Sequence, residues 1–408
     1  MSFSNPSYPS HDRAGRARRR PSMIGRLLDR SLPHLQTGRL EIALPNMAIV
    51  ARRGDGAGPE AILTMRRWRA LWRLLSEGED GFCNGYIDGD WTTPDLVKLL
   101  DLGAGNESAL APQTKKWLLS FLRNRIGHAL HANTRRGSRR NIAAHYDLGN
   151  DFFGPWLDSG MNYSAALYAG DETLEQAQDR KLDRIGELLR LRGGETILEI
   201  GCGWGALAER LIRHHGASVR GITLSTEQLR YATARLAAEI QDGRADMRLQ
   251  DYRDVTGRFD RIASIEMVEA VGERYWPVYF AKLRACLATG GIALLQAITI
   301  DDTRFSQYRK RPDFIQRHIF PGGMLPTSAI LEREAARAGL KLTHHQSFGA
   351  SYERTLHEWR RRFLQTRPKL EALKVDARFQ RLWDYYLAYC EVGFRHRVVD
   401  VGFFQFHG

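Results

Sequence analysis

The sequence predicts an α/β fold, with a doubly wound, mainly parallel sheet in the larger part of the chain and a smaller basic N-terminal domain before it. From residue 141 onward, apolar segments of strand length alternate with amphipathic segments of helix length, and a glycine-rich turn follows the first strand. The chain has 408 residues, and its first third lacks this alternation, so two domains are expected.

The positive charge of the chain is concentrated in its first third. Lys and Arg number 60 against 47 Asp and Glu, a formal charge of +13. Residues 1–140 hold 23 basic and 13 acidic side chains, a net +10, whereas residues 141–408 hold 37 and 34, a net +3. Such a surface attracts anionic polymers or anionic lipid headgroups, and composition does not choose between them.

Cysteine and histidine spacing predicts neither disulfides nor a metal site. Adjacent histidines at His214–His215 and His344–His345 point their side chains apart, and there is no Cys-x-x-Cys pair. We therefore expect no metal and a cytoplasmic protein. No apolar run approaches the roughly 18 residues that span a bilayer, so membrane contact would be peripheral, on the inner face.

The N-terminal elements are predicted in order. Residues 1–20, rich in Ser, Pro and Arg, are expected to form a flexible basic arm. Residues 23–28 have helical apolar spacing and suit a membrane-surface helix or a helix docked on its own domain. Alternation predicts a hairpin over 38–58. Residues 61–75 are interpreted as an amphipathic helix whose mixture of Arg and Trp suits a headgroup interface, or else a solvated basic face.

Residues 85–100 predict a strand, a turn and a helix, with Thr92 or Thr93 capping the helix before Pro94. A polar, breaker-rich stretch at 133–140 is the expected boundary. We thus expect one domain over 21–140 and a second domain over 141–408.

In the second domain, repeated β-α units predict a parallel sheet with helices on both faces and a ligand at the carboxyl ends of its strands. Strands are predicted at 195–200, 218–224, 246–250, 259–265 and 291–298, and helices at 174–191, 204–215, 226–239 and 275–288. Residues 300–330 are expected to be an irregular insertion, and residues 355–397 to be helical and aromatic.

The clearest chemical signal follows the first strand. Glu199 precedes glycines at Gly201, Gly203 and Gly205, and a helix begins at once. Glycines let the backbone turn tightly and approach a ligand, and the helix N-terminus offers free N–H groups. The G-x-G-x-G spacing differs from the dinucleotide G-x-G-x-x-G. It resembles motif I of class I methyltransferases, which bind S-adenosylmethionine (SAM), although a purely structural turn is the alternative.

Further segments resemble the cyclopropane-fatty-acyl-phospholipid synthase family from about residue 140 to 397, and more loosely through the N-terminal domain. They are NIAAHYDLGNDFF, MNYSAALY, GITLSTEQLRYA, LQDYRD, VEAVGERYWPVYF, FPGGMLPT, SFGASYERTL and YYLAYCEVGFR. The resemblance implies that residues 141–408 are the catalytic domain, with a class I SAM-methyltransferase fold and helical elements around a substrate pocket, and that residues 21–140 are a lipid- or membrane-binding domain. It also implies SAM contacts at Tyr163, Ser164, Gly201 to Gly205, Thr223, Ser225, Gln228, Asp251 and Tyr252, together with the preceding Glu199.

The implied reaction is attack of a cis alkene on the SAM methyl group, followed by loss of a proton from the resulting carbocation. It requires a dry apolar channel, electron-rich groups and a base. Family members use bound bicarbonate as that base. Glu269 and Tyr352 match positions that hold it, and Cys390 matches a pocket cysteine. On residue type alone, Glu269 could be a surface carboxylate and Cys390 an inert buried thiol.

Three positions depart from the family pattern. Ala165 stands where the family usually has Cys, Ala270 stands where it has His in Phe-Glu-His-Val-Gly, and Gln296 replaces a bicarbonate-contacting His. These changes weaken the expectation of bicarbonate and leave the SAM side intact. We therefore expect methyl transfer with proton loss from a neighbouring carbon, which gives a methyl-branched alkenyl chain rather than a cyclopropane.

Two other functions compete with this one. A nucleic-acid methyltransferase would suit the charge, but the chain lacks an Asn/Asp-Pro-Pro-aromatic motif and a Pro-Cys or Thr-Cys pair. The three departures would also fit a lipid-binding relative with impaired catalysis. The expected partners are an unsaturated phospholipid substrate and an anionic membrane surface, with no nucleic acid; a homodimer is left open.

Overall fold

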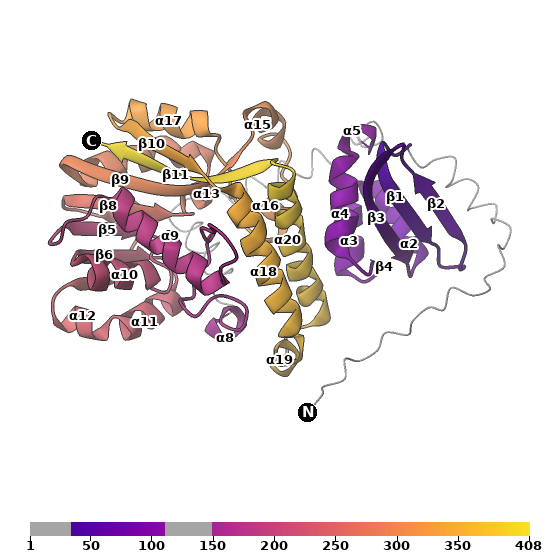
Figure 1. Ribbon diagram of the computed structural model, residues 1–408, viewed down its shortest axis with the longest axis horizontal. Coiled ribbons are helices and arrows are strands. Elements are labelled where there is room, and N and C mark those ends of the chain that lie inside the picture. Colours follow the sequence, from indigo (N-terminus) through magenta and orange to yellow (C-terminus); the bar gives the residue numbers. More distant parts are fainter. Residues whose placement is uncertain (1–33, 111–148) are drawn as a thin grey trace.

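The computed structural model describes residues 34–110 and 149–408, which form a smaller and a larger body (Figure 1). The smaller body carries a four-stranded sheet and the larger one a seven-stranded sheet. The expected arm at 1–20, the helix at 23–28 and the boundary at 133–140 lie outside the described residues.

The small sheet has the order β2-β1-β3-β4. The predicted hairpin is confirmed, since β1 (Thr37–Ala43) and β2 (Ile49–Arg53) pair antiparallel. The predicted helix at 61–75 is wrong at its start, because β3 (Gly56–Met65) occupies residues 61–65 and pairs parallel with β1. Ala61, Leu63 and Met65 are buried and Ile62 is exposed, which is the two-residue period of a strand. Helix α2 spans Trp68–Glu77.

The segment 85–100 also differs from its prediction. Its first residues end helix α3 (Glu79–Ile87), and the strand β4 is only Trp91–Thr92. The following helix α4 (Leu96–Gly105) is capped by Asp95, whose carboxylate accepts a hydrogen bond from the Lys98 backbone N–H at 3.0 Å, rather than by either threonine. Asp95 directly precedes the first helical residue, which is the position that reaches the free N–H groups. A short α5 (Glu107–Leu110) follows.

The large sheet has the order β10-β11-β9-β8-β5-β6-β7. All five predicted strands are present: β5 (Thr196–Ile200), β6 (Ser218–Thr223), β7 (Ala245–Leu249), β8 (Phe259–Ile265) and β9 (Leu287–Ile300). They run parallel, whereas the unpredicted β11 (Val399–His407) pairs antiparallel with β9 and with β10 (Lys341–Ser347). Because β11 is buried on both faces, its sequence lacks the alternation that marks a half-buried strand.

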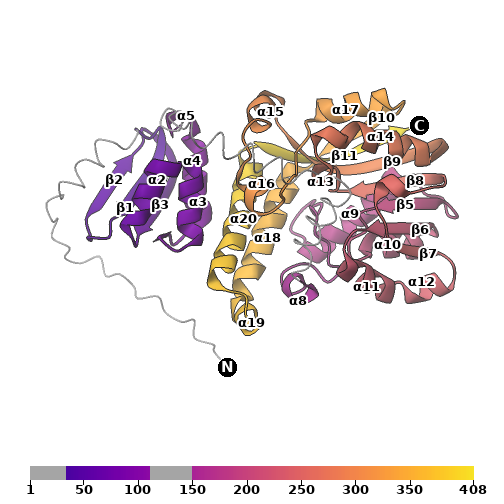
Figure 2. The same cartoon turned by 180° about the vertical axis from the view of Figure 1, so that it is seen from behind.

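Helices cover both faces of this sheet, as Figures 1 and 2 show from opposite sides. Ile197 of β5 packs in one apolar cluster with α9 and α10, and Leu198 packs in a second cluster with α14 and α17. The predicted helix at 226–239 is divided at Leu236 into two helices. The bounds are α8 (Asn150–Phe153), α9 (Leu174–Leu188), α10 (Ala206–His215), α11 (Thr226–Arg235), α12 (Ala237–Gln241), α14 (Trp276–Cys286) and α17 (Ser328–Arg337).

The C-terminal helices lie between the sheet and the small body. The expected insertion contains two short helices, α15 (Asp302–Tyr308) and α16 (Phe314–His318), and the helical C-terminal part consists of α18 (Gly349–Gln365), α19 (Arg367–Ala372) and α20 (Ala377–Arg395). Helix α20 packs against α18 on one side and against α3 and α4 on the other (Figure 1).

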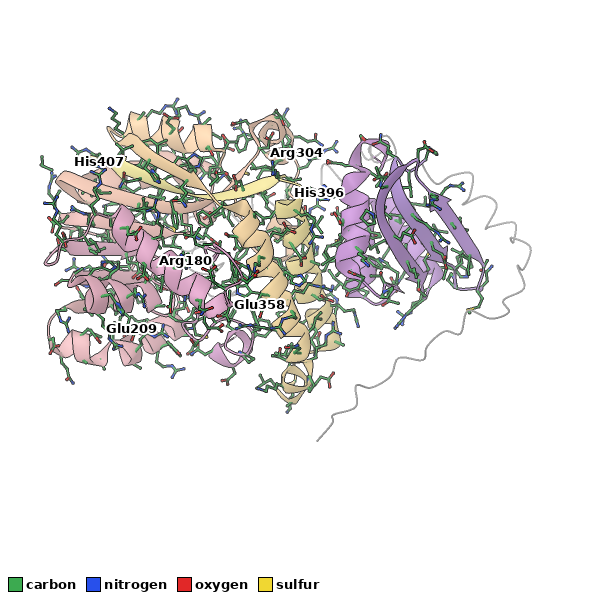
Figure 3. The ribbon with its side chains drawn as sticks, in the orientation of Figure 1. Arg180, Glu209, Arg304, Glu358, His396 and His407 are labelled. Atoms are coloured by element: carbon green, nitrogen blue, oxygen red, sulfur yellow. The ribbon has the colours of Figure 1, made fainter. Side chains whose placement is uncertain are left out.

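Polar contacts join the two bodies. Arg304 pairs with Glu107 at 2.9 Å and His396 pairs with Asp101 at 2.6 Å, both at the junction seen in Figure 3. The Tyr86 hydroxyl donates to the buried Asp384 carboxylate at 2.7 Å. Among the described residues, no helix combines the length and apolar character needed to cross a bilayer.

Candidate active site

The site lies where the strand order of the large sheet reverses. From β5 the chain runs outward through β6 to β7, then returns to form β8 on the other side of β5. A crevice opens at such a switch point, beyond the carboxyl ends of the strands. The residues found there are Gly201 after β5, Thr223 at the end of β6 and Glu266 after β8.

The glycine loop has backbone angles that favour glycine. Gly203 has a φ of +52°, and a Cβ added there would meet open space, so the backbone itself forms the wall of the crevice. Gly205 caps α10 with a φ of +85°, and a Cβ there would lie 3.1 Å from Ala232 Cβ. Gly203 therefore serves ligand access, and Gly205 lets α10 pack close to α11.

Glu199 supplies a buried carboxyl group beside this loop. Burial raises the pKa of its carboxyl to about 8, and the nearby Lys181 opposes that shift. Its Oε2 is buried and has no hydrogen-bond partner among the described residues. An unpaired buried carboxyl oxygen is costly unless a ligand satisfies it, and a positively charged ligand would favour the ionised form of this group. The ammonium group of SAM has the charge and the donors to do so, and the site therefore fits the expected cofactor.

The next strand positions a second set of polar groups. Thr223 Oγ1 donates to Gln228 Oε1 at 2.8 Å, which leaves the Gln228 Nε2 oriented as a donor suited to a ribose hydroxyl. Ser225 instead caps α11, accepting from the Gln228 backbone N–H at 3.2 Å. Tyr252 is buried and stacks edge-on against Tyr279, with its ring at the wall of the crevice.

Asp251 has contacts that differ from its expected role. Both of its carboxylate oxygens accept hydrogen bonds from the Arg253 guanidinium, the shorter at 2.6 Å. The expected bond to an adenine amine would have to compete with this ion pair. Gly205, Ser225 and Asp251 thus stand behind the wall of the crevice, whereas the other residues expected to contact SAM form part of it.

One cavity of about 1120 Å³ connects the glycine loop to an apolar region and to the small body. Its polar end includes Tyr163, Ser164, Glu199, Gly201, Gly203, Thr223, Gln228 and Tyr252. Its apolar walls come from α18 and α20 and from the inner face of the small sheet, and they include Leu356, Tyr385, Tyr386, Tyr389, Phe394, Ile42, Leu63 and Met65. The cavity can therefore hold a polar ligand and a long apolar ligand in contact with each other.

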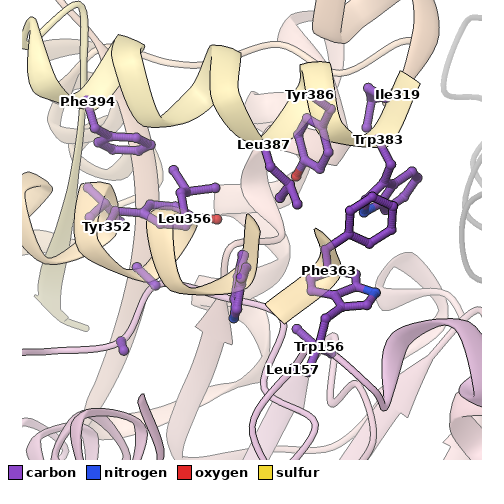
Figure 4. Close-up of a cluster of buried hydrophobic side chains, with 14 of the residues drawn as sticks. Trp156, Leu157, Ile319, Tyr352, Leu356, Phe363, Trp383, Tyr386, Leu387 and Phe394 are labelled. Carbon is purple, nitrogen blue, oxygen red and sulfur yellow. The ribbon is translucent and has the colours of Figure 1, made fainter. Parts of the chain in front are cut away.

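Aromatic side chains of α18 and α20, among them Tyr352 and Phe394, pack together in a buried cluster (Figure 4). Tyr352 and Phe394 lie with ring centroids 4.5 Å apart, and the hydroxyls of Tyr163 and Tyr386 are 2.9 Å apart. Such rings exclude water and present electron-rich faces, which attract positive charge.

The three residues expected to be catalytic all line the cavity. Glu269 is not a surface carboxylate: it accepts a hydrogen bond from the Ile298 backbone N–H, and burial, aided by Glu266, raises its pKa to about 8. Burial also raises the pKa of the Cys390 thiol, which therefore keeps its proton at neutral pH. Tyr352 donates its hydroxyl to Glu266 Oε2 at 2.8 Å.

Two functional candidates are absent from the sequence-based set. Lys181 is 1% exposed and donates to Ser164 Oγ at 2.8 Å, with burial lowering its pKa to about 8. Glu266 accepts hydrogen bonds from the Ala165 backbone N–H at 2.8 Å and the Gln296 side chain at 2.7 Å. The position of Glu266 directly after a predicted strand indicates a ligand site, since such sites lie at the carboxyl ends of strands.

Comparison with known proteins gives consistent matches. The family model described as mycolic acid cyclopropane synthetase matches residues 133–405. Tuberculostearic acid methyltransferase UfaA1 of Mycobacterium tuberculosis is 38% identical over 394 residues, covering 93% of this chain and 90% of the relative. Cyclopropane-fatty-acyl-phospholipid synthase of Escherichia coli K12 is 37% identical over 333 residues, covering 81% and 83%. The crystal structure of mycolic acid cyclopropane synthase CmaA1 complexed with SAH and CTAB is 31% identical, with a TM-score of 0.62, covering 66% of this chain and 98% of that one.

Proposed function

Because this chain belongs to the mycolic acid cyclopropane synthetase family, we propose that it transfers a methyl group from SAM to the cis double bond of an unsaturated phospholipid acyl chain. The observation that carries the proposal is the single cavity joining a SAM-type glycine loop to an apolar, aromatic chamber. The product is a methyl-branched or cyclopropane acyl chain.

SAM, when bound, supplies an electrophilic methyl group, and the polar end of the cavity holds it. Glu199 would accept from its ammonium group, Gln228 would bind a ribose hydroxyl and Tyr252 would pack on the adenine ring. These residues lie at or near the ends of strands, so each group is held at a fixed position. Methyl transfer depends on orientation and requires such fixed positions.

The apolar end excludes water from the reacting alkene. An alkene is a poor nucleophile, and a carbocation reacts with any water that reaches it, so a dry chamber is essential. The rings of Tyr163, Tyr352 and Tyr386 border the chamber and can stabilise the cation through their electron-rich faces. Cys390, protonated at neutral pH, contributes to the wall rather than acting as a nucleophile.

Labelled SAM tests this function directly. The full chain is incubated with vesicles of unsaturated phospholipid, with vesicles of fully saturated phospholipid, or with RNA. Label in the unsaturated lipid alone is the expected result. Label in RNA would assign a nucleic-acid methyltransferase, and no transfer to any acceptor would point to a relative with impaired catalysis. Mass spectrometry before and after mild hydrogenation then separates a methyl-branched alkene, which takes up hydrogen, from a cyclopropane, which resists it.

We further propose that the N-terminal region, residues 1–140, brings the enzyme to an anionic membrane. The described small body, residues 34–110, holds 8 basic and 11 acidic side chains, a net −3. The basic excess lies in the flanking sequence, at +5 in residues 1–33 and +8 in residues 111–140. Electrostatic attraction would therefore come from these two segments.

Helix α2 supports an additional apolar contact. Trp72 and Leu75 are 65% and 62% exposed on one face of the helix, and Leu75 also borders the cavity. The arginines beside them are largely engaged, since Arg69 and Arg73 both pair with the buried Asp90. Exposed Trp and Leu near a cavity mouth suit insertion at the headgroup boundary, from which an acyl chain can enter.

A further inference from the structure

We propose that the Glu266 carboxylate is the base that removes the proton from the methylated acyl chain, in the place expected of bicarbonate. This inference rests on the proposed function and names a catalytic residue for it. It comes from the donors that surround this carboxylate and from the backbone that presents it.

The donors around Glu266 are those expected around a bound anion. Oε1 accepts from the Ala165 backbone N–H at 2.8 Å and from Gln296 Nε2 at 2.7 Å, and Oε2 accepts from the Tyr352 hydroxyl at 2.8 Å. Tyr352 matches a family position that holds bicarbonate, while Ala165 and Gln296 are two of the three departures from the family pattern. Ala165, Gln296 and Tyr352 thus all donate to the same group, the carboxylate of Glu266, which is part of the chain itself.

The departures are also chemically compatible with this role. Position 165 contributes only its backbone N–H, so its side chain can be a methyl group without loss of the contact. At position 296, Gln supplies an N–H donor whose charge does not change with pH, unlike that of a histidine. The site therefore retains its donors and replaces a diffusible anion with a tethered one.

The backbone conformation at Glu266 is strained. Its φ is +48°, in the left-handed region that glycine adopts freely and that residues with a Cβ disfavour. Its backbone N–H donates to the Gln296 carbonyl at 2.7 Å, which ties this turn to β9. A glycine would satisfy the turn with less strain but would leave the three donors without their carboxylate. Strained residues of this kind cluster at functional sites.

The neighbouring carboxyl groups of Glu266 and Glu269 differ in their protonation. Glu266 has three donors, whereas Glu269 receives one, from the Ile298 backbone. Hydrogen bonds to the charged form stabilise it, so the negative charge resides on Glu266 and the proton on Glu269. Burial still raises the pKa of Glu266 above its ordinary value, which brings it closer to that of an effective base at neutral pH.

The proposed step balances without another reactant. The alkene electron pair forms the bond to the transferred methyl carbon as its bond to sulfur breaks, and the positive charge is left on the acyl chain. Glu266 then takes one proton. If that proton leaves a carbon next to the cation, its C–H pair becomes a new double bond beside the methyl branch. If it leaves the added methyl group, the pair closes a cyclopropane ring. Three hydrogen bonds hold the carboxylate in place and weaken it as a competing nucleophile.

Chemical rescue tests this assignment. Wild-type enzyme, Glu266→Gly and Glu266→Gln are assayed with labelled SAM and unsaturated vesicles in buffer stripped of carbon dioxide, with and without bicarbonate or formate. Glu266→Gly opens the anion site, whereas Glu266→Gln fills it with an uncharged group of the same size. Lys374→Gly is the matched backbone control, because Lys374 is exposed and also has a positive φ, of +60°. Formate is titrated calorimetrically into each protein, and SAM affinity is measured in the same way.

We expect the wild-type rate to be the same with and without bicarbonate, and both Glu266 variants to lose about 100-fold or more in rate. Bicarbonate or formate should restore Glu266→Gly but not Glu266→Gln, and formate should bind only Glu266→Gly, with SAM affinity little changed. A wild-type rate that depends on bicarbonate, an active Glu266→Gln, or formate binding without rescue would each overturn the proposal. If the wild type methylates no lipid, the proposed function fails, while the formate titration still decides whether Glu266 fills an anion site.

Discussion

The buried carboxyl of Glu269 should make the stability of the protein depend on pH. Burial, with a contribution from Glu266, raises its pKa from 4.5 to about 8. A carboxyl group whose pKa is higher in the folded state than in the unfolded state binds its proton more tightly when the protein is folded. Its contribution to the free energy of unfolding is therefore complete below the unfolded pKa of 4.5 and is lost as the pH rises through the folded pKa of about 8. At about 1.4 kcal/mol per pH unit, the loss across that interval is at most about 5 kcal/mol, and local relaxation will reduce it.

Glu269→Gln removes this titration and keeps an oxygen that can accept from the Ile298 backbone N–H. The melting temperature of the variant, relative to wild type, should therefore rise between about pH 5 and pH 8, by about 1 °C for each kcal/mol in a chain of 408 residues. Scanning calorimetry without SAM measures this difference. Glu187→Gln, at an exposed site on α9, is the control and should show no such trend. A difference between Glu269→Gln and wild type that stays constant across this pH range would refute the assignment of a buried, proton-holding carboxyl.

Three further changes probe other parts of the structure. Tyr352→Phe removes one donor to the Glu266 carboxylate, so the pKa of Glu266 should rise and the acid limb of the kcat/KM profile should move up by about 1–2 pH units; an unmoved limb would contradict this contact. Glu199→Gln should weaken SAM binding in calorimetry by about tenfold or more, since it removes a carboxyl group that can ionise beside the ammonium group of SAM, and unchanged affinity would exclude Glu199 from the cofactor site. Replacing Trp72 and Leu75 together with Ser should reduce cosedimentation with anionic vesicles several-fold in high salt, where attraction by the basic segments is screened; equal binding would move the membrane contact away from α2.

The sequence predicted the parts of the fold that local patterns determine. Strands β5 to β9 stand between turn residues and helices, so their apolar runs were found with their order in the chain. β11 was missed because both of its faces are buried, and residues 61–65 were assigned to a helix because an amphipathic helix follows them directly. Neither error could be corrected locally, since each depends on pairing with a strand distant in sequence.

The sequence predicted the site residues whose type is needed for one specific role. The glycine loop and the acid before it have such a purpose, and the structure brings them to the crevice. Glu266 lay outside the expected set because the family motif directed attention three residues further along, to Glu269. The ion pair between Asp251 and Arg253 depends on side-chain directions, which spacing alone does not give. Departures from a family pattern at Ala165 and Gln296 were informative, although their shared partner became visible only in three dimensions.

The cavity that spans both bodies implies a preference for acyl-chain length. One of its walls is built by Tyr386 and Phe394 of α20, and another by Ile42 and Leu63 of the small sheet. A long acyl chain can touch both walls and gain apolar contact from each, whereas a short one touches only the first. Under the proposed function, an acyl chain long enough to reach both walls would add apolar contacts between the two bodies to their polar contacts.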